Sequence, residues 1–122
     1  MAGKVYIVDD DAAVRTAVSL LIRSCGWEPV ACSSAAELFA LIGDHWPTCI
    51  LLDLEMPDMD GVSVQQELRR RGVHVPVIVI TTLGDHPLVD RAHANGAHSV
   101  ISKPFGPLDL MDVIAGVIGP LA

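Results

Sequence analysis

Five polar residues stand where apolar runs end, and together they could bind a divalent cation and a phosphoryl group. They are Asp9, Asp10, Asp53, Thr81 and Lys103. Each apolar run before them is typical of a short buried strand. In a parallel sheet the carboxyl ends of all strands lie at one edge, where ligands bind. The sequence therefore predicts a pocket with three carboxylates, a hydroxyl and an ammonium, a set suited to a cation and to a phosphorylated carboxylate.

Strand and helix patterns alternate five times along the chain. The predicted strands are Val5–Val8, Glu28–Ala31, Cys49–Leu52, Val75–Ile80 and Ser99–Ser102. A predicted helix follows each strand. The first begins after the cap Asp11 and ends at Gly26, and the second begins at Ser34. The third runs from the loop at 56–61 to Arg71, the fourth spans Asp85–Asn95 and the fifth spans Gly106–Ile118. Such an alternation with short connections favours an α/β fold with a doubly wound five-stranded parallel sheet and five helices.

Local patterns refine this arrangement. The strand Val75–Ile80 is the most apolar, so we expect it to be central, whereas the weaker Glu28–Ala31 should lie at or near an edge. Ser34 and Glu37 have the spacing of a capping box. In the helix that they begin, Leu38, Leu41 and Ile42 should form the buried face.

Size and composition limit the class of protein. The chain has 122 residues, which fits one domain, and its net charge of −7 argues against direct binding of nucleic acid. Cys25, Cys32 and Cys49 lack metal-ligand spacing and are expected to be buried free thiols, as in a reducing cytosol. No signal peptide or membrane-spanning stretch is evident, so we expect a cytoplasmic protein without a membrane partner.

Five segments, in order and each at a predicted strand end or turn, resemble the receiver domain of two-component response regulators. They are Val8-Asp9-Asp10-Asp11, Leu52-Asp53-Leu54-Glu55-Met56-Pro57-Asp58-Met59-Asp60-Gly61, Ile80-Thr81-Thr82, Asn95-Gly96-Ala97 and Lys103-Pro104-Phe105. The resemblance covers essentially the whole chain. Within the family, Gly84-Asp85-His86-Pro87 and the opening Asp9-Asp10-Asp11 with Arg15 are most similar to the FixJ-like transcriptional regulators. The resemblance to the receiver domain implies the strand order 2-1-3-4-5. It also implies a receiver domain over residues 1–122, with no output domain visible in the chain.

The resemblance also implies a role for each pocket residue. Asp53 would accept the phosphoryl group, and Thr81 and Lys103 would contact it. Mg²⁺ (or Mn²⁺) would be bound directly by Asp10 and Asp53, through water by Asp9, and by the backbone carbonyl of Glu55. The Lys103–Pro104 peptide bond would be cis and would aim the lysine into the pocket.

The implied function is that of a signalling switch and not of a conventional enzyme. A phosphohistidine on a sensor histidine kinase would be the donor, and the chain would assist both its own phosphorylation and its dephosphorylation. Phosphorylation would then repack the fourth helix and the fifth strand and could create a homodimer surface there. The output would be transcription regulation through a DNA-binding domain absent from this chain.

Two residues depart from the family pattern and keep an alternative open. Val100 stands three positions before Lys103, where many members have an aromatic ring, and Thr82 stands where the family prefers Gly or Ala. Thr82 would narrow access to Asp53. The alternative is a degenerate or single-domain receiver that acts as a protein-interaction platform.

Two other classes fit less well. A haloacid-dehalogenase-type phosphatase would place a second aspartate where Glu55 stands and would carry cap residues. A flavodoxin would have a Ser/Thr-rich phosphate loop after the first strand, and this chain has none.

Overall fold

Five parallel strands form one sheet in the order β2-β1-β3-β4-β5, as predicted. The computed structural model describes residues 3–43, 45–84 and 86–118. The strands are β1 (Lys4–Val8), β2 (Glu28–Cys32), β3 (Cys49–Asp53), β4 (Val77–Thr81) and β5 (Ser99–Ser102). The predicted second strand is therefore an edge strand, and it extends one residue further, to Cys32.

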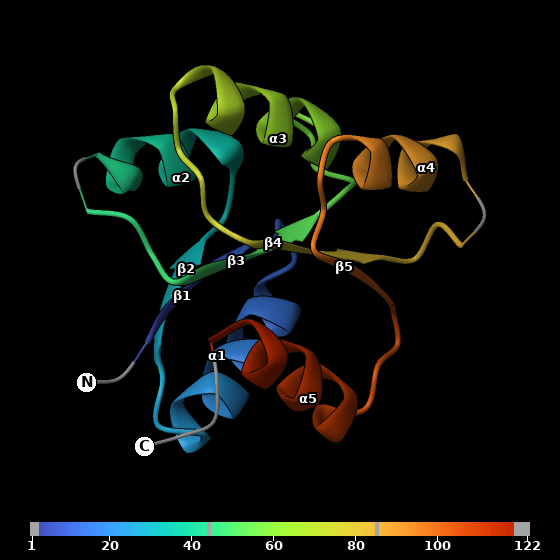
Figure 1. Ribbon diagram of the computed structural model, residues 1–122. Helices are drawn as coiled ribbons and strands as arrows, with labels where there is room; N and C mark the ends of the chain where they lie inside the picture. Colours follow the sequence, from blue (N-terminus) through green and yellow to red (C-terminus); the bar gives the residue numbers. More distant parts are fainter. Residues whose placement is uncertain (1–2, 44, 85, 119–122) are drawn as a thin grey trace.

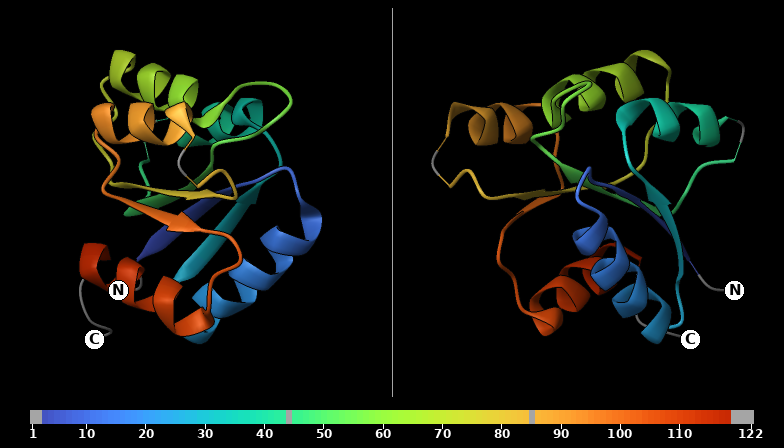
Figure 2. Two further views of the ribbon diagram at one scale, coloured as in Figure 1. Left: turned by 90° about the vertical axis from the view of Figure 1, so that its right-hand side faces the viewer. Right: turned by 180° about the vertical axis from the view of Figure 1, so that it is seen from behind.

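Helices cover both faces of the sheet. They are α1 (Ala12–Ser24), α2 (Ala35–Ile42), α3 (Gly61–Arg70), α4 (Pro87–Ala94) and α5 (Pro107–Ile118). Figure 1 shows α2, α3 and α4 on one face and α1 and α5 on the other, and the turned views in Figure 2 show the same three layers. This arrangement leaves the strand ends as the place where loops from both layers meet.

The helix starts follow the predicted caps. The Asp11 side chain accepts hydrogen bonds from the backbone N–H groups of Ala13 and Val14, at 2.9 and 3.4 Å. Ser34 accepts one from the Glu37 N–H at 3.2 Å. The Glu37 carboxylate, however, accepts from the N–H and hydroxyl of Ser33, one residue before the cap, so only half of the predicted capping box forms.

The core lies on both sides of β1, β3 and β4. Every residue of β3 and β4 is buried, and so is β1 from Val5 onward. β4 is an inner strand between β3 and β5, so the expectation that the most apolar strand is central and not at an edge was confirmed; β3 is the middle strand of the five. β4 also begins at Val77 and not at Val75, because Pro76 has no N–H to donate; its carbonyl accepts from the Ile50 N–H at 3.0 Å.

Other predictions were confirmed or corrected in detail. Cys25, Cys32 and Cys49 are buried free cysteines, as expected. Leu41 is 50% exposed, so the predicted buried face of α2 is wrong there: Ala35, Leu38 and Ile42 fill it instead. The fourth helix is shorter than predicted, beginning at Pro87 and ending at Ala94, and Asp85 lies outside the described residues. Among the described helices, none has both the length and the apolar character needed to cross a membrane.

Candidate functional site

The five predicted pocket residues come together at one edge of the sheet. The register aligns Val8 with Leu52, and so brings Asp9 of the β1 end beside Asp53 of the β3 end. β4 and β5 are aligned in the same direction, with Thr81 opposite Ser102, so Lys103 follows at the same edge. Asp9, Asp53 and Thr81 are only 3%, 6% and 1% exposed, whereas Asp10 is exposed.

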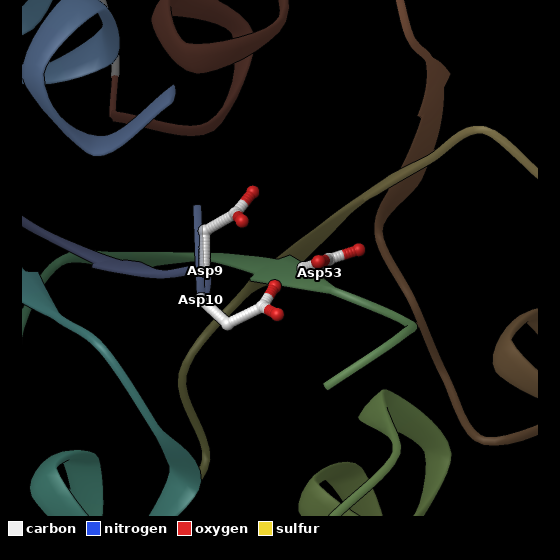
Figure 3. Close-up of side chains that lie close together, drawn as sticks. All are labelled: Asp9, Asp10 and Asp53. Carbon is white, nitrogen blue, oxygen red and sulfur yellow. The ribbon is translucent and has the colours of Figure 1, made fainter. Parts of the chain in front are cut away.

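Three carboxylates form the acidic centre of this site. One oxygen each of Asp9, Asp10 and Asp53 lies within 4.8 Å of the others. Figure 3 shows Asp9 and Asp10 leaving the end of β1 and Asp53 leaving the end of β3 on the same side. Like charges this close repel unless a cation lies among them, and oxygen ligands at this spacing suit a hard divalent ion. The donor set therefore fits a metal site.

Lys103 supplies the positive charge on the other side of the site. Its Nζ donates to Asp9 Oδ2 at 2.9 Å and lies 3.8 Å from Asp53 Oδ2. Burial lowers the pKa of Lys103, but the Asp9 hydrogen bond and the charges of Asp53 and Asp9 outweigh it and raise the pKa above its usual value. The Lys103–Pro104 bond is cis, as expected. The two distances show that Lys103 points into the pocket, and its raised pKa keeps it charged there.

Asp53 is set apart from an ordinary surface carboxylate by its surroundings. Burial raises its pKa to about 6, and the charges of Asp9 and Asp10 act in the same direction. A hydrogen bond from the Glu55 N–H to Asp53 Oδ1, 3.2 Å long, and the charge of Lys103 oppose this rise without cancelling it. At neutral pH Asp53 therefore carries a negative charge that Lys103 balances only in part and that a bound cation would neutralise.

Asp9 has two further contacts that the sequence did not predict. Asp9 Oδ1 accepts a hydrogen bond from the Asp11 N–H at 2.9 Å, and the Arg15 guanidinium donates to the Asp9 backbone carbonyl at 2.7 Å. The sequence indicated Asp11 as a helix cap and Arg15 as part of the family pattern. Neither signal predicted that these residues contact Asp9. The first contact fixes the carboxylate that Lys103 also holds, and the second fixes the backbone of the same residue.

The hydroxyl of Thr81 is tied back into its own loop. Thr81 Oγ1 accepts a hydrogen bond from the Leu83 N–H at 3.0 Å. The next residue, Thr82, donates from Oγ1 to Glu55 Oε1 at 3.3 Å, a contact that no sequence signal indicated. The loops after β3 and β4 are thus joined directly beside Asp53.

Gly61 allows α3 to begin against the backbone of the site. A Cβ there would lie 2.8 Å from the Asp53 carbonyl oxygen and 2.9 Å from Leu54 Cα, closer than real Cβ atoms come. The Gly61 N–H donates to the Leu54 carbonyl at 2.9 Å. Only glycine therefore lets the loop after β3 fold back so tightly behind Asp53.

Known proteins resemble this chain over nearly its full length. Nodulation protein W of Bradyrhizobium diazoefficiens is 38% identical over 110 residues, 90% of this chain and 48% of that protein. The transcriptional regulatory protein FixJ of Azorhizobium caulinodans is 34% identical over 115 residues, 94% of this chain and 54% of that protein. The crystal structure of FixJ-N superposes with a TM-score of 0.89 at 31% identity, covering 100% of this chain and 98% of that one.

The family itself follows from a match over most of the chain. The chain spans about half the length of the curated relatives that it matches. The family model described as "Response regulator receiver domain" matches residues 5–115. With the sheet order and the acidic site described above, this match shows that the chain belongs to the receiver domain family of two-component response regulators.

Proposed function

We propose that this chain accepts a phosphoryl group on Asp53 from a sensor histidine kinase and changes conformation in response. The observation that carries the proposal is a buried Asp53 carboxylate with two further carboxylates within 4.8 Å and the Lys103 ammonium 3.8 Å away. A receiver domain implies a cognate histidine kinase, and it is a signalling switch, not a conventional enzyme. The carboxylate that would accept the phosphoryl group and the ammonium group that partly balances its charge therefore lie in one site.

The proposed transfer forms one bond and breaks one. An Asp53 carboxylate oxygen attacks the phosphorus of the phosphohistidine, the new O–P bond gives an acyl phosphate, and the P–N bond breaks. The imidazole leaves with the electron pair and is protonated from solvent. The transition state is loose and highly charged, so the contribution of the chain is mainly positioning and charge neutralisation. Hydrolysis by water returns the Asp53 carboxylate and releases inorganic phosphate.

Chain groups are assigned to these tasks by their positions. Lys103 Nζ would shift from its contact with Asp9 to a phosphoryl oxygen, and Thr81 would donate its hydroxyl to another. Asp10 and Asp53 would hold Mg²⁺ (or Mn²⁺) directly, Asp9 through water, and Glu55 through its backbone carbonyl. When bound, the cation neutralises negative charge as it develops on the phosphoryl oxygens.

The proposed response travels through the β4–α4 side of the site. Phosphorylation adds about −1.5 to −2 charges, which draw Thr81 and its loop toward Asp53. We propose that this repacks α4 and β5 and exposes a homodimer surface there. Relatives of this chain are named as transcriptional regulators and are about twice as long. We therefore propose transcription regulation through a DNA-binding domain as the output, with no direct nucleic-acid contact by this domain.

The deciding experiment measures the intact mass of the protein after incubation with acetyl phosphate, with and without Mg²⁺. We expect a Mg²⁺-dependent gain of one phosphoryl group that Asp53→Asn abolishes. Asp112→Asn, the same change at an exposed carboxylate of α5, is the matched control and should behave as wild type. No gain in the wild type, with Mg²⁺ binding still detectable, would overturn the proposal in favour of an interaction platform.

A second experiment tests the response. Amide spectra of the protein before and after phosphorylation should differ mainly in the β4–α4 loop, α4 and β5, and light scattering should show a dimer after phosphorylation. Unchanged spectra on that face would contradict the proposed conformational response, even if Asp53 is phosphorylated.

A further inference from the structure

We propose that the Thr82–Glu55 contact holds the β4–α4 loop against the β3–α3 loop and so opposes the movement of Thr81 toward the phosphoryl group. Thr82 would then be a positioning residue that sets how readily Asp53 is phosphorylated. The inference rests on the proposed function and adds a regulatory contact that the family pattern does not supply, since the family prefers Gly or Ala at this position.

The contact joins two loops that are distant in sequence. Thr82 Oγ1 donates to Glu55 Oε1 at 3.3 Å, and the two residues are 27 positions apart. Glu55 is itself fixed to the phosphoacceptor, because its N–H donates to Asp53 Oδ1 at 3.2 Å. The Thr82 hydroxyl is therefore connected to Asp53 through a single residue.

Thr81 cannot move without affecting this contact. Thr81 and Thr82 share a peptide bond, and the Thr81 carbonyl accepts from the Lys103 N–H at 2.8 Å. The Thr81 hydroxyl accepts from the Leu83 N–H, which fixes the first turn of the loop. A displacement of Thr81 toward Asp53 would carry Thr82 with it and would stretch or break the hydrogen bond to Glu55.

Charge makes the contact specific to the unphosphorylated state. Glu55 is an exposed carboxylate directly beside the site, and a phosphoryl group on Asp53 adds about −1.5 to −2 charges close to it. Repulsion would push the Glu55 side chain away from Asp53 and from the position where it accepts from Thr82. A contact present in only one of two states biases the equilibrium toward that state.

Two substitutions separate the hydrogen bond from the bulk of the side chain. Thr82→Val keeps the branched shape and removes the hydroxyl, whereas Thr82→Ser keeps the hydroxyl and removes the methyl group. An exposed hydrogen bond of modest strength predicts that Thr82→Val raises the rate of phosphorylation by acetyl phosphate about two- to fivefold. The affinity for beryllofluoride, an analogue of the phosphoryl group, should rise by the same factor. Thr82→Ser should match the wild type in both.

A double-mutant cycle tests whether Glu55 is the residue through which Thr82 acts. Glu55→Ala should raise the rate as Thr82→Val does, and Thr82→Val should have no further effect once Glu55 is alanine. Thr16→Val makes the same chemical change at an exposed residue of α1 and serves as the control for loss of a hydroxyl. Additive effects of the two substitutions, or an equal gain in Thr82→Ser, would overturn the proposal, the latter by showing that bulk and not the hydrogen bond limits the reaction.

A readout in the unphosphorylated protein keeps this inference separate from the proposed function. The Leu83 N–H is hydrogen-bonded to Thr81 Oγ1, so its exchange with solvent reports how firmly the loop is held. We expect this exchange to be about two- to fivefold faster in Thr82→Val and unchanged in Thr82→Ser. If the wild type cannot be phosphorylated, the proposed function fails, and the exchange rates still decide the inference: unchanged exchange in Thr82→Val would overturn it.

Discussion

The two sides of the proposed phosphorylation site are held in place very differently. On the β1–β3 side, Asp9 is fixed by the Asp11 N–H, by Lys103 and through its own N–H to the Cys32 carbonyl. All of β3 is buried, and so is β1 from Val5 onward. The groups that would bind the cation therefore stand on the most firmly packed part of the molecule.

On the other side β4 is fully buried, but α4 and β5 beyond it are less so. None of the four residues of β5, all of them described, is fully buried. α4 has eight residues, and Ala92 is the one described as buried. Segments with few buried apolar contacts open at low free energy. The difference teaches that the chain separates two tasks: the groups that would bind the cation stand on fully buried strands, and the elements that would repack, α4 and β5, are the ones with little buried surface.

The largest expected effect comes from the residue that joins the two sides. Lys103→Met removes the charge that neutralises Asp9 and Asp53, so we expect the phosphorylation rate with acetyl phosphate to fall about 100-fold or more. Lys4→Met is the matched control, because Lys4 is exposed and pairs at 3.5 Å with Glu28 on the surface. An unchanged rate in Lys103→Met would remove lysine from the proposed chemistry.

A matched pair of valines compares the packing of the two sides directly. Val8 in β1 is fully buried, whereas Val100 in β5 is partly buried against the same apolar cluster. Val8→Ala should lower the free energy of unfolding by about 2–3 kcal/mol, and Val100→Ala by less than about 1 kcal/mol. Urea unfolding measures both. Equal losses would break the comparison, because β5 would then be packed as firmly as β1.

The only partly balanced charge of Asp53 gives a pH-dependent effect. Its pKa is about 6 in the folded protein against 3.8 ordinarily, so the folded state binds the proton more tightly, and stability falls as the pH rises through that range. At pH values above about 6, Asp53→Asn should therefore raise the metal-free free energy of unfolding by about 1–3 kcal/mol. The gain should shrink as the pH falls toward 3.8.

Urea unfolding in a chelating buffer at several pH values measures this effect. Asp112→Asn, the same change at an exposed carboxylate, is the matched control. A gain in Asp53→Asn that is independent of pH would mean that the substitution acts through packing and not through charge.

The smallest effects should come from the helix caps on the two sides. The Asp11 carboxylate accepts two N–H groups of α1, whereas at α4 the His86 ring accepts one, from Leu88, at 3.0 Å. Asp11→Ala should lower the free energy of unfolding by about 1 kcal/mol and His86→Ala by about 0.5 kcal/mol or less. Urea unfolding of both variants measures this, and a larger loss for His86→Ala would reverse the proposed order of the two sides.

Much of the fold and site could be predicted because each signal was local. The apolar runs indicated all five strands and placed Asp9, Asp53 and Lys103 at or next to their ends, and the family resemblance gave the strand order. The parallel arrangement then places these residues at one edge without further information. The roles of these residues stay predictions until phosphorylation is measured.

The remaining features depend on contacts between segments that a local pattern does not contain. The Thr82–Glu55 hydrogen bond and the Arg15 contact with the Asp9 carbonyl arise only when loops meet. Leu41 fits the apolar pattern of α2 but is exposed, because Ala35, Leu38 and Ile42 form the buried face of the helix. The strand start at Val77 was missed because an apolar run does not show which N–H groups find partners.

The ion pair between Lys103 and Asp9 has a consequence for biosynthesis. Its two residues are 94 positions apart, so the chain from Asp9 through Lys103 must have left the ribosome before they can meet. A nascent chain that ends before β5 already contains all three carboxylates of the acidic centre but not the lysine. Under the proposed function, such a nascent chain would already contain the acceptor Asp53 but would still lack Lys103, which the transfer needs. Competence for signalling would therefore be among the last properties that this domain acquires as it is made.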